Sequence, residues 1–226
     1  MKVFVGWDSR EDIAFQVAKH SIQKHNPDVE VYPLKLPTLQ ELGIYTRGVD
    51  AKASTEFTFS RFFVPMLTGY KGWALFIDCD FLCRADIKEL FNQANDNYAV
   101  MVAKHDYTPK EGTKMDGKQQ LQYPRKNWSS CMLWNCEHPA NKLLDANSMN
   151  TNDGLWHHRF VWLADHEIGE ISHEWNWLTD WYNEPKGYYS SQNEVPTING
   201  GKFIVGEFKD TLPTFFSKKR PKASII

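Results

Sequence analysis

No stretch of this sequence is apolar over a length that would span a bilayer, and its start, Met1 to Trp7, is too short and too soon interrupted to be a signal peptide. Neither sign of charge is in excess, since 26 Lys and Arg stand against 28 Asp and Glu, so nothing indicates a nucleic-acid ligand or an acidic disordered chain. The 4 cysteines have no C-x-x-C spacing, and we interpret them as reduced core thiols rather than zinc ligands or disulfides. We therefore expect a cytoplasmic protein without an integral membrane segment.

The length of 226 residues fits one domain with ample chain to bury a core. No internal repeat or low-complexity linker divides the sequence. From Lys209 onward it is basic, with a cluster at Lys218-Lys219-Arg220-Pro221-Lys222. We expect a single domain over residues 1–208, followed by a basic C-terminal tail over residues 209–226.

The first part of the chain alternates strand and helix patterns. Lys2–Gly6 is a short apolar run, Ser9-Arg10-Glu11-Asp12 has the S-x-x-D form of a helix start, and Val29–Leu34 is a second strand. A β-α-β opening predicts a parallel sheet with ligands outside the carboxyl ends of its strands. Asp8 lies at such an end. It is either a capping or turn aspartate or a carboxylate that accepts hydrogen bonds from a nucleotide base or ribose.

Two acidic residues follow an apolar run further along the chain. Trp73 to Ile77 shows no helical period and leads into Asp78-Cys79-Asp80, which is typical of a buried strand that delivers charge to a sheet edge. Along a strand, Asp78 and Asp80 leave on one side and Cys79 on the other. Carboxylates this close repel each other unless a cation lies between them. Mg²⁺ and Mn²⁺ take oxygen ligands and leave positions for phosphates, so the pattern indicates a metal and phosphate site.

A helix is predicted over Glu56–Leu67, with most of its phenylalanines on one face. Arg61 lies off this apolar stripe. It either forms a surface salt bridge or, because the helix is close in sequence to the carboxylate strand, reaches a diphosphate or a sugar hydroxyl.

Later segments carry weaker signals. Trp128–Asn135 is predicted to be a strand, and a helix is expected from Asn152 onward, with the adjacent His157 and His158 on a solvated face. Gly200-Gly201-Lys202 is either a turn between strands or a ligand loop. In the second case the glycines allow close backbone approach and the lysine neutralises phosphate.

This ordered set of motifs resembles the GT-A-fold glycosyltransferases and is most similar to glycosyltransferase family eight and its small bacterial and viral relatives. The resemblance runs from Val3 to about Phe208 and predicts an α/β fold with a mostly parallel central sheet flanked by helices. It rests on Val5-Gly6-Trp7-Asp8, on Phe59-Ser60-Arg61-Phe62, on Phe76-Ile77-Asp78-Cys79-Asp80, and on Asn127 to Asn135, which is similar to that family's N-S-G-V-M-L-x-N strand.

The resemblance implies a role for each matching residue. Asp8 would hold the nucleotide base, Arg61 would contact the donor's phosphate or sugar, and Asp78 and Asp80 would bind Mn²⁺ or Mg²⁺, with Asp78 also near the ribose. Asp153 falls where the family tends to carry an acidic residue near the reacting sugar. The other implied contacts to the nucleotide sugar are Asn127, Ser130, Gly200, Gly201 and Lys202.

The C-terminal motif departs from the family pattern. Pro196 stands where the family has a metal-binding histidine, and Phe203 replaces its tryptophan region. Proline offers no side-chain ligand, although Asn199 is close enough in sequence to supply an oxygen. Either the ion is held by Asp78, Asp80, diphosphate and water, or this chain binds metal poorly.

The function expected from these observations is metal-assisted transfer of a sugar from a nucleoside diphosphate donor, with a UDP-sugar favoured, to a carbohydrate or other hydroxyl acceptor. The resemblance implies retention of anomeric configuration. The segments Thr38–Thr55 and His105–Asn127 are candidate lids that exclude water. Two alternatives stay open: a catalytically impaired nucleotide- or glycan-binding protein, and a nucleotidyltransferase, although Gly6-Trp7-Asp8-Ser9-Arg10 is not a glycine-rich phosphate loop.

Overall fold

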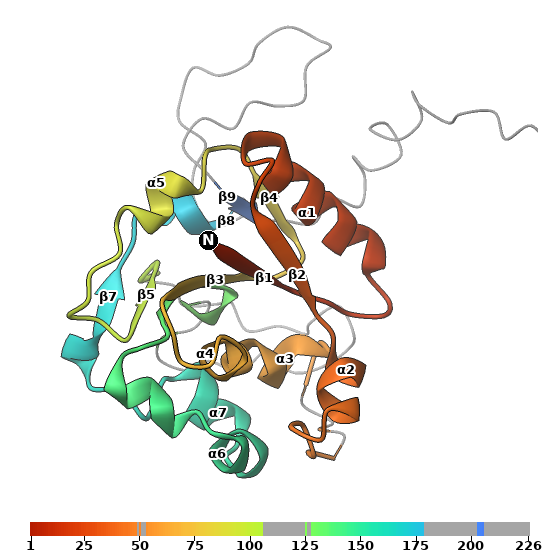
Figure 1. Cartoon of the computed structure of the whole chain (residues 1–226), viewed down its shortest axis with the longest axis vertical. Coiled ribbons are helices and arrows are strands. Elements are labelled where there is room, and N and C mark those ends of the chain that lie inside the picture. Colours follow the sequence, from red (N-terminus) through yellow and green to blue (C-terminus); the bar gives the residue numbers. More distant parts are fainter. Residues whose placement is uncertain (49, 51–52, 106–124, 126–127, 179–202, 206–226) are drawn as a thin grey trace, which may run out of the picture.

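The computed structural model describes residues 1–48, 50, 53–105, 125, 128–178 and 203–205. Within these residues, six strands form one mixed sheet in the order β2-β1-β3-β6-β5-β7 (Figure 1). The strands are β1 (Lys2–Gly6), β2 (Glu30–Leu34), β3 (Trp73–Ile77), β5 (Val100–Val102), β6 (Cys131–Asn135) and β7 (Ile168–Glu170). The pairs β1–β2, β1–β3 and β5–β7 are parallel, whereas β6 runs antiparallel to β3 and β5. The expected α/β architecture with a mostly parallel sheet is confirmed.

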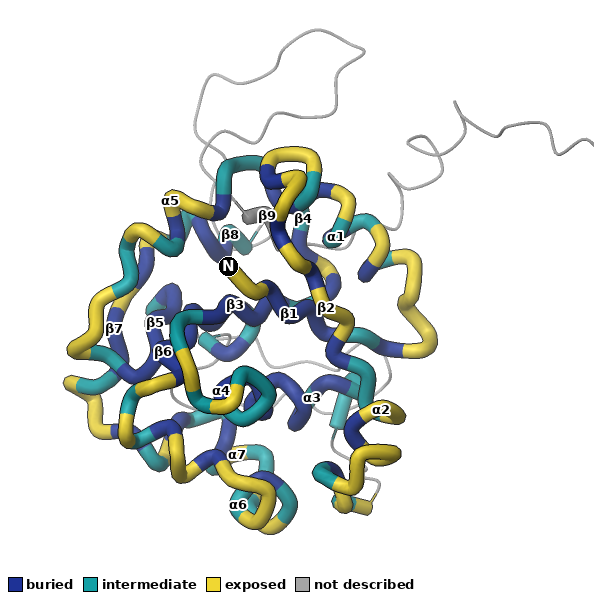
Figure 2. Tube along the Cα trace, in the orientation of Figure 1, coloured by how far each residue is buried: buried dark blue, intermediate teal, exposed yellow. Residues whose placement is uncertain are grey.

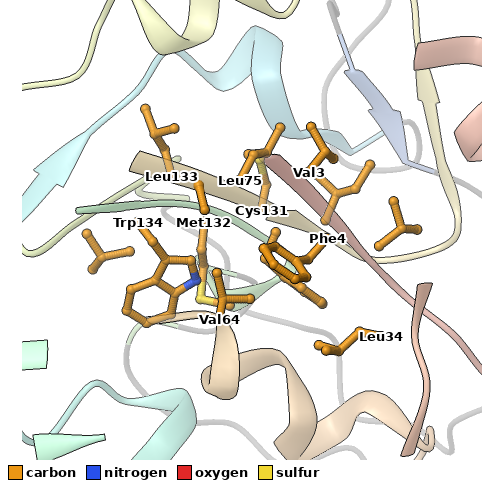
Figure 3. Packing of buried hydrophobic residues seen from close by; sticks show 14 of the residues in the cluster. Val3, Phe4, Leu34, Val64, Leu75, Cys131, Met132, Leu133 and Trp134 are labelled. Carbon is orange, nitrogen blue, oxygen red and sulfur yellow. The ribbon is translucent and has the colours of Figure 1, made fainter. Parts of the chain in front are cut away.

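The apolar runs of β1, β3 and β6 form the buried centre of the sheet. Figure 2 shows these strands as buried, and Figure 3 shows side chains from them packed together with Val64 from a covering helix. Leu75 and Leu133 are fully buried and lie opposite each other across the antiparallel pair. Burial of such a side chain stabilises a fold by about 1.5–3 kcal/mol, which explains why both faces of these strands are apolar.

A second, smaller sheet follows directly after the acidic motif. It joins β4 (Phe81–Cys83), β9 (Phe203–Val205) and β8 (Trp177–Leu178) in the order β4-β9-β8. The helix α1 (Asp12–His25) packs against β4, and the backbone N–H of Cys83 donates a hydrogen bond of 2.9 Å to Oγ of Ser21 on that helix. The sequence predicted a helix start at Ser9, but α1 begins at Asp12 without a side-chain cap.

Helices α3, α4 and α7 cover the face of the large sheet that is turned away from α1 (Figure 1). The predicted helix over Glu56–Leu67 is present but divided into α3 (Phe57–Ser60), the 3-10 turn η1 (Arg61–Phe63) and α4 (Val64–Leu67). Pro65 explains the division, because proline has no backbone N–H to donate to the carbonyl of Arg61. The remaining elements are α2 (Leu36–Glu41), α5 (Lys88–Phe91), η2 (Trp128–Ser130), η3 (Pro139–Leu143), α6 (Ala146–Thr151), α7 (Gly154–His158), η4 (Asp165–Glu167) and η5 (His173–Asn176).

Within the described residues, none of the helices combines the length and the apolar character that crossing a membrane requires. The expected basic tail over residues 209–226 lies outside the described residues. The four cysteines Cys79, Cys83, Cys131 and Cys136 are buried free thiols, as the sequence predicted.

An aromatic cluster joins α7 to the turn η1, which lies between α3 and α4. The ring of Phe62 contacts His157, His158 and Trp162 with centroid distances of 5.2–6.0 Å. His157 is fully buried, and its Nδ1 lies 2.8 Å from the carbonyl oxygen of Asp153. The expectation that both histidines lie on a solvated face is therefore wrong for His157, because α7 turns this residue toward the phenylalanines.

The buried imidazole of His157 predicts a loss of stability in acid. Burial lowers the pKa of His157 from 6.5 to about 4, so an unfolded chain takes up this proton at a higher pH than the folded protein does. The stabilisation is therefore complete above pH 6.5 and is lost as the pH falls toward 4. We expect the free energy of unfolding to fall by at most about 3 kcal/mol from this group, measured by denaturant titration across this range.

His157→Gln keeps an N–H donor for the carbonyl of Asp153 but removes the titrating group. We expect this variant to show a shallower loss of stability with falling pH than the parent protein. Some acid sensitivity will remain, because burial also lowers the pKa of His105 to about 4. An unchanged pH dependence in His157→Gln would show that His157 does not contribute.

Candidate functional site

The candidate site lies at the edge of the large sheet where β1 and β3 end and β6 begins. Val5 pairs with Ile77, and Ile77 pairs with Cys131, so the residues that follow β1 and β3 and those that precede β6 share one edge. The backbone N–H of Asp78 donates a hydrogen bond of 3.0 Å to the carbonyl oxygen of Ser130. The fold thus brings two of the predicted site residues together from distant parts of the sequence.

The carboxylate of Asp78 is paired with Arg61. Nη1 of Arg61 lies 2.8 Å from Oδ1 of Asp78, and the two side chains are 7% and 19% exposed. The guanidinium also donates through Nε to the carbonyl oxygen of Phe57 at 3.2 Å and through Nη1 to that of Ser129 at 2.9 Å. Arg61 is therefore a buried residue that points at the acidic motif, and the prediction of a surface salt bridge does not describe it.

The contact between Arg61 and Asp78 is an ion pair. Oδ1 of Asp78 is buried and has no hydrogen-bond partner within the part of the chain that the structure describes. Burial raises the pKa of Asp78 to about 7, while Arg61 opposes this shift and the charge of Asp80 adds to it. Asp78 is thus a carboxylate whose charged form is not fully compensated by the protein.

Asp80 lies in a turn rather than on the strand, because β3 ends at Ile77. The strict alternation expected along an extended strand therefore does not apply. Asp80 is exposed, Cys79 is buried, and Sγ of Cys79 lies 3.6 Å from Oε2 of Glu11. Neighbouring protein atoms exclude water from part of the Asp80 carboxyl and so raise its pKa, and the charge of Glu11 raises this pKa further.

The chemistry of these two carboxylates fits a hard divalent cation. A cation relieves the repulsion between the two carboxylates, which the raised pKa of Asp78 reflects. Among the residues that the structure describes, no group of three or more His, Cys, Asp or Glu side chains is arranged to hold a metal ion. Of the two predicted metal ligands, Asp78 and Asp80, both lie within the described residues at this edge of the sheet.

Asp8 is fully buried at the end of β1, with its carboxylate engaged by the protein. Its oxygens accept hydrogen bonds from the side chain of Arg10 at 2.8 and 2.9 Å, from the backbone N–H of Arg10 at 3.0 Å and from that of Glu56 at 3.1 Å. The hydrogen bond from the Arg10 side chain lowers the pKa of Asp8 to about 2. The turn role kept open in the sequence is present, and contact with a nucleotide base stays a prediction.

Several residues at this edge were missed by sequence reasoning. Ser129 places its Oγ 2.7 Å from Nδ1 of His158, and Nδ2 of Asn176 donates to Oγ of Ser130 at 2.9 Å. Arg10 adds a hydrogen bond from Nη2 to the carbonyl oxygen of Ser54 at 2.9 Å. The position of Arg10 two residues after Asp8 was a possible signal, whereas the other contacts join segments far apart in the sequence.

The structure gives Asp153 a local role. Its carboxylate accepts a hydrogen bond of 2.7 Å from the backbone N–H of Trp156 and so caps the start of α7. Asp153 is exposed, and its predicted place near a reacting sugar stays a prediction. The predicted site residues Asn127, Gly200, Gly201 and Lys202 lie outside the described residues, as do Pro196 and Asn199.

Comparison of the sequence with known proteins identifies a relative. No protein-family model matches the sequence. Protein CDI of Arabidopsis thaliana is 54% identical over 178 residues, which cover 78% of this chain and 69% of that protein.

Solved glycosyltransferase structures share the fold. The apo structure of WbbM, a bifunctional glycosyltransferase, has a TM-score of 0.54 at 15% identity and covers 77% of this chain, which spans only 39% of WbbM. A glycosyltransferase involved in glycosylation of the major capsid of PBCV-1 has a TM-score of 0.52 at 10% identity and covers 90% of this chain and 92% of its own. The predicted GT-A fold is confirmed.

Proposed function

The chain belongs to the family of Protein CDI of Arabidopsis thaliana, and we propose that it is a glycosyltransferase that moves a sugar from a nucleoside diphosphate donor to a hydroxyl group of an acceptor. The observation that carries the proposal is the carboxylate pair Asp78 and Asp80 at the edge of a GT-A sheet. Asp78 is largely buried there, and its burial together with the charge of Asp80 raises the pKa of its carboxyl although Arg61 is paired with it. The resemblance to family eight favours a UDP-sugar donor and retention of configuration.

In this proposal Asp78 and Asp80 are the residues that would hold Mg²⁺ or Mn²⁺. The ion, when bound, stabilises the negative charge that grows on the departing diphosphate. Arg61 acts as a positioning residue, because its guanidinium contacts Asp78 and the carbonyl of Ser129 and so fixes the carboxylate relative to β6. The predicted direct contact between Arg61 and the donor would require a rearrangement of these bonds.

The transfer needs no protein nucleophile. The acceptor oxygen bonds to the anomeric carbon on the face that the diphosphate leaves, the bond from that carbon to the diphosphate oxygen breaks, and the proton of the acceptor hydroxyl passes to the departing oxygen. The chain's task is to orient donor and acceptor and to exclude water, which would otherwise take the acceptor's place.

A panel of nucleotide sugars tests the proposal. We expect the protein with Mn²⁺ to hydrolyse at least one of them slowly in the absence of an acceptor, with a UDP-sugar preferred, and the same protein with a chelator to be far slower. Release of nucleoside diphosphate is the readout. If no member of the panel is turned over with or without acceptors, the proposed transferase activity is wrong.

The Arg61–Asp78 ion pair favours one alternative, a protein that binds nucleotide without transfer. The guanidinium of Arg61 already provides Asp78 with a positive charge, which is part of what a metal ion would supply. Binding of UDP without any donor turnover would support this alternative.

A further inference from the structure

A pocket of about 380 Å³ lies beside the candidate site, between α2, the segment that follows it and the start of α3. Its size falls within the usual range of pockets that bind small molecules. The residues that matter for its chemistry are Arg10, Gln40, Tyr45, Arg47, Glu56 and Phe59. Figure 1 shows α2 beside α3, the helix that leads into the turn carrying Arg61.

Arg47 is held in the wall of this pocket by two hydrogen bonds and a ring contact. Its Nη1 donates hydrogen bonds to the carbonyl oxygens of Met149 at 2.9 Å and Asn152 at 2.7 Å. Its guanidinium carbon lies 3.8 Å from the ring centroid of Phe59. No carboxylate in the described part of the chain forms an ion pair with Arg47. The guanidinium has five N–H groups, so donors beyond those of Nη1 can bind a ligand oxygen.

Glu56 supplies the complementary acceptor. Its Oε1 accepts a hydrogen bond from Oγ of Ser9, whereas its Oε2 is buried and has no hydrogen-bond partner within the described residues. Buried acceptors are normally satisfied, so an unsatisfied one in a pocket wall indicates a missing donor. A ligand hydroxyl is such a donor, and a phosphate oxygen is not.

The charges of the pocket also favour a neutral occupant over an anionic one. Arg10 and Arg47 are matched by Asp50 and Glu56, and the guanidinium of Arg10 is already paired with Asp8. A diphosphate would meet two carboxylates here, whereas a neutral group that both donates and accepts hydrogen bonds meets complementary partners.

We propose that this pocket binds the hydroxyl groups of a neutral sugar and is the acceptor pocket of the transferase. The assignment as acceptor pocket rests on the proposed function, while the binding of a sugar does not. The pocket is joined to the candidate site through Glu56, whose backbone N–H donates a hydrogen bond to the carboxylate of Asp8. It is also joined to that site through α3, which is followed directly by Arg61.

Neutral methyl glycosides of glucose, galactose, mannose and xylose are the probes, offered at millimolar concentration and observed by saturation-transfer NMR. We expect at least one of them to receive saturation from the protein, and expect Arg47→Met to weaken its binding by about tenfold through loss of charged donors. Gln40→Ala provides a second variant on the surface of α2, where loss of folding is not expected. Glu41→Ala is the matched control, because Glu41 is exposed on the same helix and does not line the pocket.

Three outcomes would overturn the proposal. The first is that no glycoside binds the parent protein, and the second is that the pocket variants bind the glycoside as well as Glu41→Ala does. The third is that Arg47→Met loses binding of inorganic pyrophosphate but keeps binding of the glycoside. Where donor hydrolysis is found, the ratio of transfer to hydrolysis should fall about tenfold in Arg47→Met. An unchanged ratio would reject the acceptor assignment alone. Absent donor hydrolysis in the parent protein counts against the proposed function, and the NMR readout still decides whether the pocket takes a sugar.

Discussion

Replacement of Asp80 by asparagine is expected to lower sugar transfer by about two to three orders of magnitude. Asp80 is exposed at the end of the acidic motif, and no cation of the described residues forms an ion pair with it. The amide keeps the shape of the side chain but removes the negative charge that a divalent ion needs. Initial rates of transfer with saturating donor, measured over a range of Mn²⁺ concentrations, provide the readout.

Asp28→Asn is the matched control for this experiment. Asp28 is exposed between α1 and β2, and the same chemical change there should leave rate and Mn²⁺ dependence as in the parent protein. We expect Asp80→Asn to fold with a stability no lower than that of the parent protein, because the raised pKa of Asp80 shows that the fold disfavours the charge that the amide removes. Full activity of Asp80→Asn with an unaltered response to Mn²⁺ would remove the metal from the account.

Replacement of Arg61 by methionine is expected to destabilise the fold by about 3–5 kcal/mol. The substitution leaves the largely buried carboxylate of Asp78 without its guanidinium partner and frees the carbonyl oxygens of Phe57 and Ser129. The cost arises from a buried charge that has lost its compensation rather than from lost apolar contact. Equilibrium unfolding in denaturant measures this change.

The double variant Arg61→Met with Asp78→Asn separates the charge from the packing. Removal of both charges should recover a large part of the stability lost in Arg61→Met, since no uncompensated carboxylate remains. Arg159→Met, at a partly buried arginine of the α7 region, controls for loss of a long cationic side chain. If the two changes simply add, the pair is not coupled and Arg61 does not hold Asp78.

Much of the architecture was predictable, because strand patterns depend on local sequence. β1 has the predicted bounds, and the apolar run before Asp78 is the buried strand β3. Strand direction was not predictable, since the burial pattern of β6 is the same whether it runs parallel or antiparallel. The division of the helix at Pro65 follows from the missing backbone N–H of proline, which the helical spacing of the phenylalanines does not reveal.

The candidate site was predictable in its residue types but not in its contacts. The spacing of Asp78 and Asp80 was visible in the sequence, whereas the enclosure of Asp78 by Arg61 and Ser129 depends on segments that only tertiary packing brings together. Likewise, Asp8 was recognised at a strand end and its bond to Arg10 is local, but its bond to the backbone N–H of Glu56 depends on the course of a segment distant in the sequence. Hydrophobic periodicity carries no information about such long-range polar pairs.

Calorimetric titration of UDP into the full chain, with and without Mn²⁺, tests the central claim most directly. If Asp78 and Asp80 share a divalent ion with a diphosphate, UDP should bind at least about tenfold more tightly with Mn²⁺ than without it. Asp80→Asn should abolish this difference. Equal affinity in both conditions, or no binding of UDP in either, would contradict the account.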